Sequence, residues 1–259
     1  MKEIPRWMIL LLYPMPLLAL LIFWQVYSSA DVHRQFIFSS PSQVWHTFVS
    51  LLASGELGKH AATTISEALI GFVAGTVIGA AIGLSLWSST IVAKISKPYI
   101  AALGSIPIFA LTPMIIAWFG IGILSKIMLA FISTVVVAIV QSYQGAMSVE
   151  PRFLRFMHVV GASKFQTFRT VVVPSSWIWV VNAMKLNIGL ALLGAFIGEF
   201  ISAEQGLGYM IVRASGLYDI ATVLVGVFTL VAIALCFTAL VEQLEKKLLP
   251  WRVASENNM

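Results

Sequence analysis

Three ionisable side chains lie within or at the edges of long apolar stretches of the sequence: Glu67, Lys185 and Glu199. Charged groups are costly in lipid, so they usually face a partner, a cavity or the membrane interface. Lys185 lies deepest, about 15 Å along a helix axis beyond Pro174, and we expect an interior partner for it. Structural pairing and direct contact with a solute both stay open for Lys185, and Glu67 and Glu199 could instead reach the lipid headgroups.

Further polar residues join these three as candidates for a translocation pathway. Asn182 and Gly189 share the helical face of Lys185, at positions i−3 and i+4. Ser105 lies next to Pro107, where a proline would bend a helix, and bent helices often line cavities in transporters. The candidate pathway residues are therefore Glu67, Ser105, Asn182, Lys185 and Glu199.

Catalytic and metal-binding patterns have little support in this chain. His60 and His158 are lone histidines with no partner at metal-ligand spacing. The sequence contains no G-x-x-x-x-G-K-[ST] phosphate loop and no serine elbow motif. We therefore expect no catalytic, cofactor-binding or metal-binding residue, and we do not expect an enzyme. An intramembrane enzyme using Glu67, Lys185 or Glu199 for proton transfer, or a passive channel, are the rival classes.

A basic, aromatic segment between apolar stretches runs from Arg155 to Pro174. Its apolar residues recur every three or four positions and predict one helical stripe, with arginines on a second face. Gly161 permits a sharp turn or a close backbone approach, and Pro174 suits the first turn of the following helix. From the residues alone, a helix docked on a partner protein and a helix lying on anionic lipid are equally favoured. The stripe comprises Leu154, Met157, Gly161, Phe165, Phe168 and Val172.

Composition places these residues in a membrane protein. The chain of 259 residues is 59% hydrophobic and 10% charged, with a mean hydropathy of +0.93. Six apolar runs approach or exceed the ~20 residues that cross a bilayer, and they should be helices because lipid satisfies no backbone group. We predict an all-α membrane protein with a single transmembrane domain over 1–250 and a polar tail over 251–259. The runs are 8–27, 61–87, 99–119, 126–145, 177–200 and 220–241.

The distribution of positive charge predicts the orientation. Eleven of the sixteen lysines and arginines fall in the tails and alternate loops. By the positive-inside rule both termini are cytoplasmic, so the net charge of +5 reflects topology and indicates no nucleic-acid partner. The first apolar run is long for a signal peptide and is expected to be an uncleaved anchor. These cations are Lys2, Arg6, Lys94, Lys97, Arg152, Arg155, Lys164, Arg169, Lys246, Lys247 and Arg252.

Three smaller patterns complete the predicted architecture. Gly71, Gly75, Gly79 and Gly83 form one narrow helix face that favours close packing within the bundle, with a dimer contact as the alternative. A short external helix is expected from about Pro41 to Ala53, and prolines 107 and 113 should bend the third span. The segment 202–219 should hold a turn and a re-entrant or surface helix.

The segment from Gly161-Ala162-Ser163 to Pro174 resembles the coupling loop of bacterial ABC importer permeases, although Arg155-Phe156-Met157 stands where that pattern has Glu-Ala-Ala. Other stretches look like the nitrate/sulfonate/taurine branch of that family, and the resemblance covers most of the chain. They are Thr64–Phe72, Ser105-Ile-Pro107, Pro113 with Trp118-Phe119-Gly120, Gly198-Glu199 and Gly206-Leu-Gly208-Tyr209.

The resemblance implies a type I importer permease with a cytoplasmic coupling helix between its fourth and fifth spans, in a loop over about 146–176. It implies a bacterial inner-membrane assembly: two copies of this chain, two ATPase subunits that hold the ATP, and a periplasmic or lipid-anchored solute-binding protein, surrounded by lipid. Coupling to the ATPase would fall on Arg155, Met157, Gly161, Ala162, Ser163, Phe165, Phe168 and Pro174.

The solute is less well defined by the sequence. Lys185 near a cavity would favour small organic anions of the sulfonate, nitrate or carboxylate kind. Glu67 and Glu199 favour instead a pyrimidine-type vitamin precursor that donates hydrogen bonds. We expect a small organic anion, with the pyrimidine precursor as the alternative.

Overall fold

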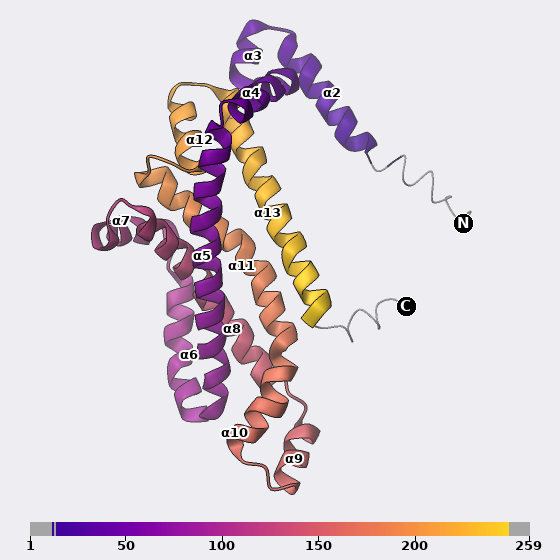
Figure 1. The fold of residues 1–259 in the computed structure, drawn as a ribbon, viewed down its shortest axis with the longest axis vertical. Helices are drawn as coiled ribbons and strands as arrows, with labels where there is room; N and C mark the ends of the chain where they lie inside the picture. Colours follow the sequence, from indigo (N-terminus) through magenta and orange to yellow (C-terminus); the bar gives the residue numbers. More distant parts are fainter. Residues whose placement is uncertain (1–11, 13, 249–259) are drawn as a thin grey trace, which may run out of the picture.

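The computed structural model describes residue 12 and residues 14–248 of the chain, and all regular structure in that part is helical (Figure 1). The polar tail predicted over 251–259 and the first part of the predicted anchor lie outside these residues. The helices are α2 Met15–Ser29, α3 Val32–Phe38, α4 Pro41–Ala53, α5 Glu56–Ser85, α6 Thr90–Ser105, α7 Ile108–Phe119, α8 Ile123–Met147, α9 Pro151–Val159, α10 Lys164–Thr167, α11 Val173–Ser202, α12 Leu207–Gly216 and α13 Ile220–Leu248, with a 3-10 turn η1 at Leu86–Ser88 and a π-helix η2 at Phe168–Val172.

Four described helices are long and apolar enough to cross a membrane: Glu56–Ser88, Ile123–Met147, Lys164–Ser202 and Ile220–Leu248. A fifth span is possible if α6 and α7 count as one broken span, because they meet at 92°. The apolar α2 has 15 described residues and corresponds to the first predicted run. The multi-span α-helical fold is confirmed, with four to five spans recognised in place of about six.

The glycine face of α5 packs against α8 inside the molecule. A Cβ atom added to Gly75 would lie 2.0 Å from Oγ1 of Thr134, and one added to Gly79 would lie 2.5 Å from the carbonyl oxygen of Val135. The α8 side of this contact also carries a small residue every four positions: Ala130, Thr134, Ala138 and Ser142. Small residues on both helices let the backbones approach closely. The glycines therefore serve bundle packing, as the sequence favoured.

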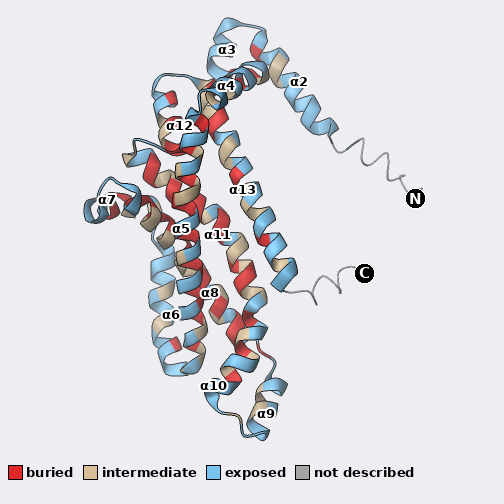
Figure 2. Cartoon of the chain, viewed as in Figure 1, coloured by how far each residue is buried: buried red, intermediate tan, exposed pale blue. Residues whose placement is uncertain are grey.

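Helix α11 packs against α8 and α5 and completes a three-helix centre (Figure 2). Leu129, Ala191 and Ala195 are buried where α8 and α11 meet, and Gly194 lies directly against the α8 backbone at Ala130. Larger side chains face outward along the same helices, as expected for surfaces covered by lipid. This centre holds the polar groups described below.

The predicted bend near Pro107 is a complete break between two helices. Helix α6 ends at Ser105, Ile106 has an extended backbone, and Pro107 is the N-cap of α7. Pro113 lies inside α7 and interrupts nothing further. Proline has no backbone N–H, but an N–H at the start of α7 would have no partner within the helix. Pro107 therefore costs no helical hydrogen bond, and the chain can turn sharply there. Figure 1 shows α7 projecting sideways from the bundle.

The short helices α3, α4 and α12 gather at one end of the bundle, and α9 and α10 lie at the other (Figure 1). The short helix predicted over Pro41–Ala53 is confirmed as α4, which is capped by the Ser40 side chain. Helix α12 confirms the helix predicted within 202–219. Helix α3 was not predicted. Its Asp31 N-cap accepts a hydrogen bond from the amide of His33.

Candidate functional site

A buried polar cluster joins α5, α8 and α11 near the end of the bundle that carries α12. Its charged members are Glu67 on α5, Lys126 on α8 and Glu199 on α11, which are 3%, 2% and 1% exposed. Charged residues are almost never buried to this degree unless their polar atoms are paired. Glu67 and Glu199 thus lie inside the protein and not among lipid headgroups.

Glu199 is fully engaged by hydrogen bonds. Thr64 donates its hydroxyl to Oε1 at 2.6 Å, and the amide of Gly208 donates to Oε2 at 2.6 Å. Both are charge-assisted bonds of the strong kind if the carboxylate is ionised. Glu199 therefore ties the end of α11 to α5 and to the start of α12.

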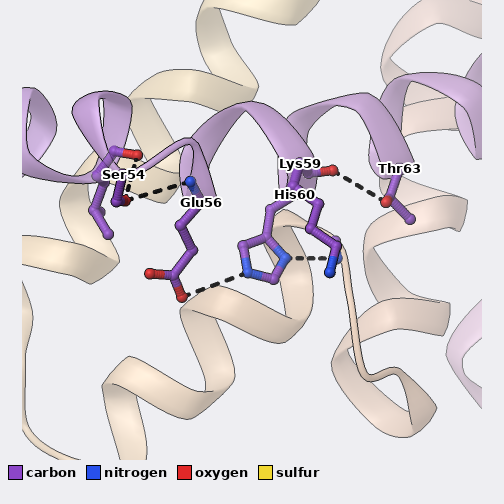
Figure 3. A network of polar contacts seen from close by, with 7 residues as sticks. Ser54, Glu56, Lys59, His60 and Thr63 are labelled. Carbon is purple, nitrogen blue, oxygen red and sulfur yellow. Dashed lines mark hydrogen bonds and ion pairs between the residues drawn. The ribbon is translucent and has the colours of Figure 1, made fainter.

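The first amides of α12 are satisfied by side chains from other helices. The amide of Gly206 donates to Nδ1 of His60 at 3.0 Å, and that of Leu207 donates to Oγ1 of Thr64 at 2.9 Å. Helix N-termini leave such amides without internal partners, and α12 has no side-chain cap of its own. Figure 3 shows His60 on the first turns of α5, with Glu56 reaching its other ring nitrogen at 3.8 Å.

Two glycines make this arrangement sterically possible. Gly206 has φ +111°, and a Cβ atom there would lie 2.2 Å from the carboxyl carbon of Glu199. At Gly208 the added atom would lie 2.8 Å from Cβ of Glu199. The Gly-Leu-Gly motif thus has a physical reason: the loop backbone must press directly onto a buried carboxyl group.

The ammonium group of Lys126 donates hydrogen bonds to backbone and hydroxyl oxygens. Its ammonium donates to the carbonyl of Ile121, to the carbonyl of Ser202 at 2.5 Å and to Oγ of Ser202 at 3.4 Å. Its stem crosses α11 at Gly198, where a side chain would lie 2.9 Å from Cγ of the lysine. Lys126 is the first residue of the predicted apolar run 126–145 and was not among the candidate residues, so its burial was missed.

Glu67 differs from its neighbours because no N–H or hydroxyl group of the described residues donates to its buried Oε2. Its carboxyl group lies within hydrogen-bonding reach of the carboxyl group of Glu199. Glu67 also lines a cavity of about 520 Å³ between α5, the start of α8 and the loop before α12. The other lining residues are Thr63, Ser66, Ile121, Gly122, Ile123, Lys126, Ala203, Glu204 and Gln205.

The remaining predicted pathway residues lie away from this cluster. Lys185 forms an ion pair with Glu245 of α13 at 2.6 Å, and its side chain is 35% exposed. Asn182 is half-buried on the same helix, whereas Ser105 is exposed at the break between α6 and α7. The structure therefore brings together only Glu67 and Glu199 of the five candidates.

A second polar pair in the centre of the bundle was missed by sequence reasoning. Asn187 is completely buried and donates to Oγ1 of Thr76 at 2.9 Å, while its own Oδ1 has no partner among the described residues. Asn187 lies two residues from Lys185 on α11, and so it faces another side of that helix. A buried asparagine inside an apolar run was the signal that could have identified it.

At the opposite end of the bundle, α9 and α10 form a helical pair joined by a turn at Gly161. Gly161 has φ +72°, and the amide of Ala162 reaches back to the carbonyl of Met157 at 2.9 Å. This is the left-handed glycine stop that commonly ends a helix. Ser163 and Gln166 then form a capping box that starts α10. The turn predicted at Gly161 is confirmed.

The predicted apolar stripe is divided between two surroundings. Val172 is fully buried, and Leu154 and Phe168 pack on a cluster that includes Leu84 and Trp87 of the bundle itself. Phe165 is 70% exposed, and Phe156 and Val159 on α9 are also exposed. Part of the stripe therefore anchors the pair, and other apolar residues form its free surface. Lys164 adds a further tie, donating to the carbonyl of Ser88 at 2.9 Å.

A π-helical turn connects this pair to α11. The amide of Val173 bonds to the carbonyl of Phe168, five residues earlier, directly before Pro174. Proline cannot donate to the helix ladder, and a locally wider turn is one way in which a helix accommodates it. Pro174 thus lies within one continuous helix over Lys164–Ser202.

These features define a multi-span helical membrane subunit with a buried polar cluster at one end and an exposed helical pair at the other. The family model described as "Binding-protein-dependent transport system inner membrane component" matches residues 71–250. The chain belongs to this family, and it is an ABC transporter permease.

Individual relatives cover nearly the whole chain. The riboflavin transport system permease protein RibX of Chloroflexus aurantiacus is 32% identical over 93% of this chain and 90% of its own length. The putative aliphatic sulfonates permease SsuC of Bacillus subtilis is 28% identical over 96% and 90%. The formylaminopyrimidine permease ThiX of Halalkalibacterium halodurans is 28% identical over 91% and 93%.

The fold is also found in solved structures. A chain of the MetNI methionine ABC transporter, in an inward-facing conformation, matches with a TM-score of 0.66 at 17% identity, covering 81% of this chain and 99% of that one. The predicted type I importer fold is confirmed.

Proposed function

We propose that this chain is one of two identical membrane subunits of an importer that moves a small organic solute inward at the expense of ATP. Two separate ATPase subunits hold and hydrolyse the ATP, and an external solute-binding protein, periplasmic or lipid-anchored, delivers the solute. The chain itself binds no cofactor. The family description supports the binding protein, the membrane and the transport role.

The observation that carries the coupling proposal is the exposed helical pair α9–α10. It is fixed to the bundle by Leu154, Phe168 and Lys164, yet it leaves Phe165, Phe156 and other apolar side chains uncovered. A rigid pair with an uncovered apolar surface suits a groove on another protein better than water. Arginines on the same segment would surround the contact, and the positive-inside rule then assigns this end and both termini to the cytoplasm.

The polar groups favour a solute that donates hydrogen bonds over the small organic anion preferred from sequence. Lys185 is paired with Glu245 at 2.6 Å, and Lys126 is bound to backbone carbonyls. Glu245 therefore neutralises the charge of Lys185, and the N–H donors of Lys126 are already occupied by oxygens of Ile121 and Ser202. The pyrimidine-type alternative suits the buried carboxyl groups, and the relatives named for riboflavin and formylaminopyrimidine support it, whereas SsuC supports the anion.

The coupling proposal is tested with Gly161→Trp. Gly161 has open space around it, so the indole does not disturb the bundle but stands on the proposed docking surface. We expect normal membrane insertion, with loss of ATPase capture in a pull-down and loss of solute uptake. Gly161→Ala is the control, since it adds the cost of a positive φ without the bulk. Normal capture and uptake in Gly161→Trp would show that the ATPase docks elsewhere.

A further inference from the structure

A groove of about 270 Å³ lies between α6 and α8, on the half of the bundle towards the α9–α10 pair. It is open to the surroundings, because Lys97 and Ala101 on its wall are exposed. Apart from Lys97, Tyr143 and Gln144, the wall is aliphatic. All of α6 is described, and Ala93 is its only buried residue (Figure 2). Helix α6 therefore packs loosely on α8 and leaves an apolar groove open to the membrane.

Positive charge gathers at the end of this groove where α6 begins. Lys94 and Lys97 lie one helical turn apart on α6, and both are exposed. Among the described residues, neither ammonium group forms an ion pair. The start of α6 lies beside the α9–α10 pair, since Lys164 donates to the carbonyl of Ser88 at 2.9 Å.

The direction of these lysine side chains follows from helix geometry. Side chains tilt towards the N-terminus of their helix, and lysines in membranes extend the ammonium group to the water interface. Lys94 and Lys97 therefore direct their charge to the headgroups at the α9–α10 end. The aliphatic wall, formed in part by Ile100 and Ile139, continues among the acyl chains.

The combination of an aliphatic wall and unpaired positive charge selects one kind of occupant. A small anion from water would leave the apolar wall uncovered. A second copy of the chain, packed through this groove about a two-fold axis, would bring the lysines of both copies together, and like charges repel. A lipid with an anionic headgroup satisfies both parts, because its acyl chain covers the wall while its phosphate meets the ammonium groups.

We propose that the groove between α6 and α8 binds one anionic phospholipid, with an acyl chain against Ile100 and Ile139 and the phosphate at Lys94 and Lys97. The lipid fills the space that α6 leaves beside α8 and so holds this helix on the bundle. The inference rests on the proposed function only for the leaflet: the proposed orientation places this end in the cytoplasmic leaflet, which carries anionic lipid.

The test measures lipid binding to the purified full-length chain in dodecyl maltoside by native mass spectrometry. The probes are dioleoyl phosphatidylglycerol and dioleoyl phosphatidylcholine, which share their acyl chains and differ in net charge, and glycerol 1-phosphate, which has no acyl chain. We expect phosphatidylglycerol to bind at least about fivefold more tightly than phosphatidylcholine, on the scale of one lysine near a lipid surface. Glycerol 1-phosphate at the same concentration should displace neither lipid.

Three outcomes of this measurement overturn the proposal. Equal affinities for the two lipids would show that the charge is not used. Displacement of phosphatidylglycerol by glycerol 1-phosphate would show a site for free phosphate. Phosphatidylglycerol bound to the monomer but absent from a dimer of the chain would show that a second copy covers the groove.

Three variants assign the binding to the groove. Lys97→Gln should weaken phosphatidylglycerol by about fivefold and leave phosphatidylcholine unchanged. Lys247→Gln is the matched control, because it removes an exposed lysine at the end of α13, outside the groove, and it should change either affinity by less than about twofold. Ala101→Phe fills the groove from an exposed position without altering the charge, and it should weaken both lipids. Equal losses in the two lysine variants, or normal lipid binding by Ala101→Phe, overturn the site.

A second measurement uses the stability of the unaltered chain. A ligand that binds only the folded chain raises its Tm, so Tm should be higher in micelles containing phosphatidylglycerol than in micelles containing phosphatidylcholine. The difference should disappear in Lys97→Gln and persist in Lys247→Gln. Equal Tm values of the unaltered chain in the two lipids overturn the site. The capture of the ATPase, measured separately with Gly161→Trp, decides the proposed function whatever the lipid result.

Discussion

The substitution Gly206→Ala tests whether the polar cluster depends on the close approach of the loop to Glu199. Gly206 has φ +111° and ψ 161°, a backbone conformation that is essentially confined to glycine. The added methyl group would lie 2.2 Å from the carboxyl carbon of Glu199 and 2.4 Å from one of its oxygens. Either the loop or the carboxyl group must move.

The expected loss of stability is the sum of two contributions, the backbone strain at residue 206 and the hydrogen bonds that Glu199 loses. Backbone strain contributes about 1–3 kcal/mol. Displacing Glu199 breaks at least one of its hydrogen bonds, to Thr64 or to the amide of Gly208, at about 1.5–3 kcal/mol for a bond to a charged group. The free energy of unfolding should therefore fall by roughly 2.5–6 kcal/mol. For a chain of this size that corresponds to a decrease of Tm of at least about 5 °C, on the scale of soluble domains.

The assay is thermal unfolding of the purified chain in detergent, monitored by circular dichroism. Gly58→Ala is the matched control, because Gly58 lies on the exposed face of α5 with no atom within 4 Å of an added Cβ. It should gain about 0.5–1 kcal/mol from helix propensity. If Gly206→Ala melts at the temperature of the unaltered chain, the loop does not press on Glu199 and the account of the Gly-Leu-Gly motif is wrong.

Three further outcomes are expected. Gly79→Leu should reduce the yield of folded protein, since its Cβ would lie 2.5 Å from the carbonyl oxygen of Val135. Gly189→Ala should leave the yield unchanged, because Gly189 has open space around it. Equal yields of the two variants would contradict the α5–α8 packing. Lys185→Met should lower stability by about 1 kcal/mol, because the ion pair with Glu245 is partly exposed, and unchanged melting with reduced uptake would indicate direct solute contact instead. The purified chain alone should release no phosphate from ATP, as measured by a colorimetric phosphate assay, and measurable hydrolysis would refute the assignment of ATP to a partner.

Periodicity in the sequence was sufficient to predict the local features of the fold. The four glycines of α5 share a face at every fourth position, and this predicts close packing whatever the partner helix is. The proline and serine at the start of α4 likewise define a helix from local chemistry alone. The break at Pro107 was predicted as a bend, since a proline shows where a helix is interrupted but not how far the chain then turns.

The polar cluster could be predicted only in part, because it depends on which helices meet. Glu67 and Glu199 are visible as acidic residues in apolar runs, but Lys126 lies at the start of a run and resembles a loop cation. Its burial follows from Gly198 on α11, which makes room for its stem. Asn187 and Thr76 are 111 positions apart and meet only in the folded bundle. Such pairings form only in the tertiary structure, so no regular spacing in the sequence reveals them.

The π-helical turn at Phe168–Val172 sets the direction in which the α9–α10 pair points about the axis of α11. A π turn holds one residue more than an α turn, and each residue of an α-helix rotates the chain by about 100°. Deleting one residue there would restore a regular helix but swing the α9–α10 pair about the axis of α11. The exposed surface of Phe165 would then point away from its present direction. The number of residues in this turn, more than their identity, therefore sets the direction in which the permease presents the exposed surface of the α9–α10 pair.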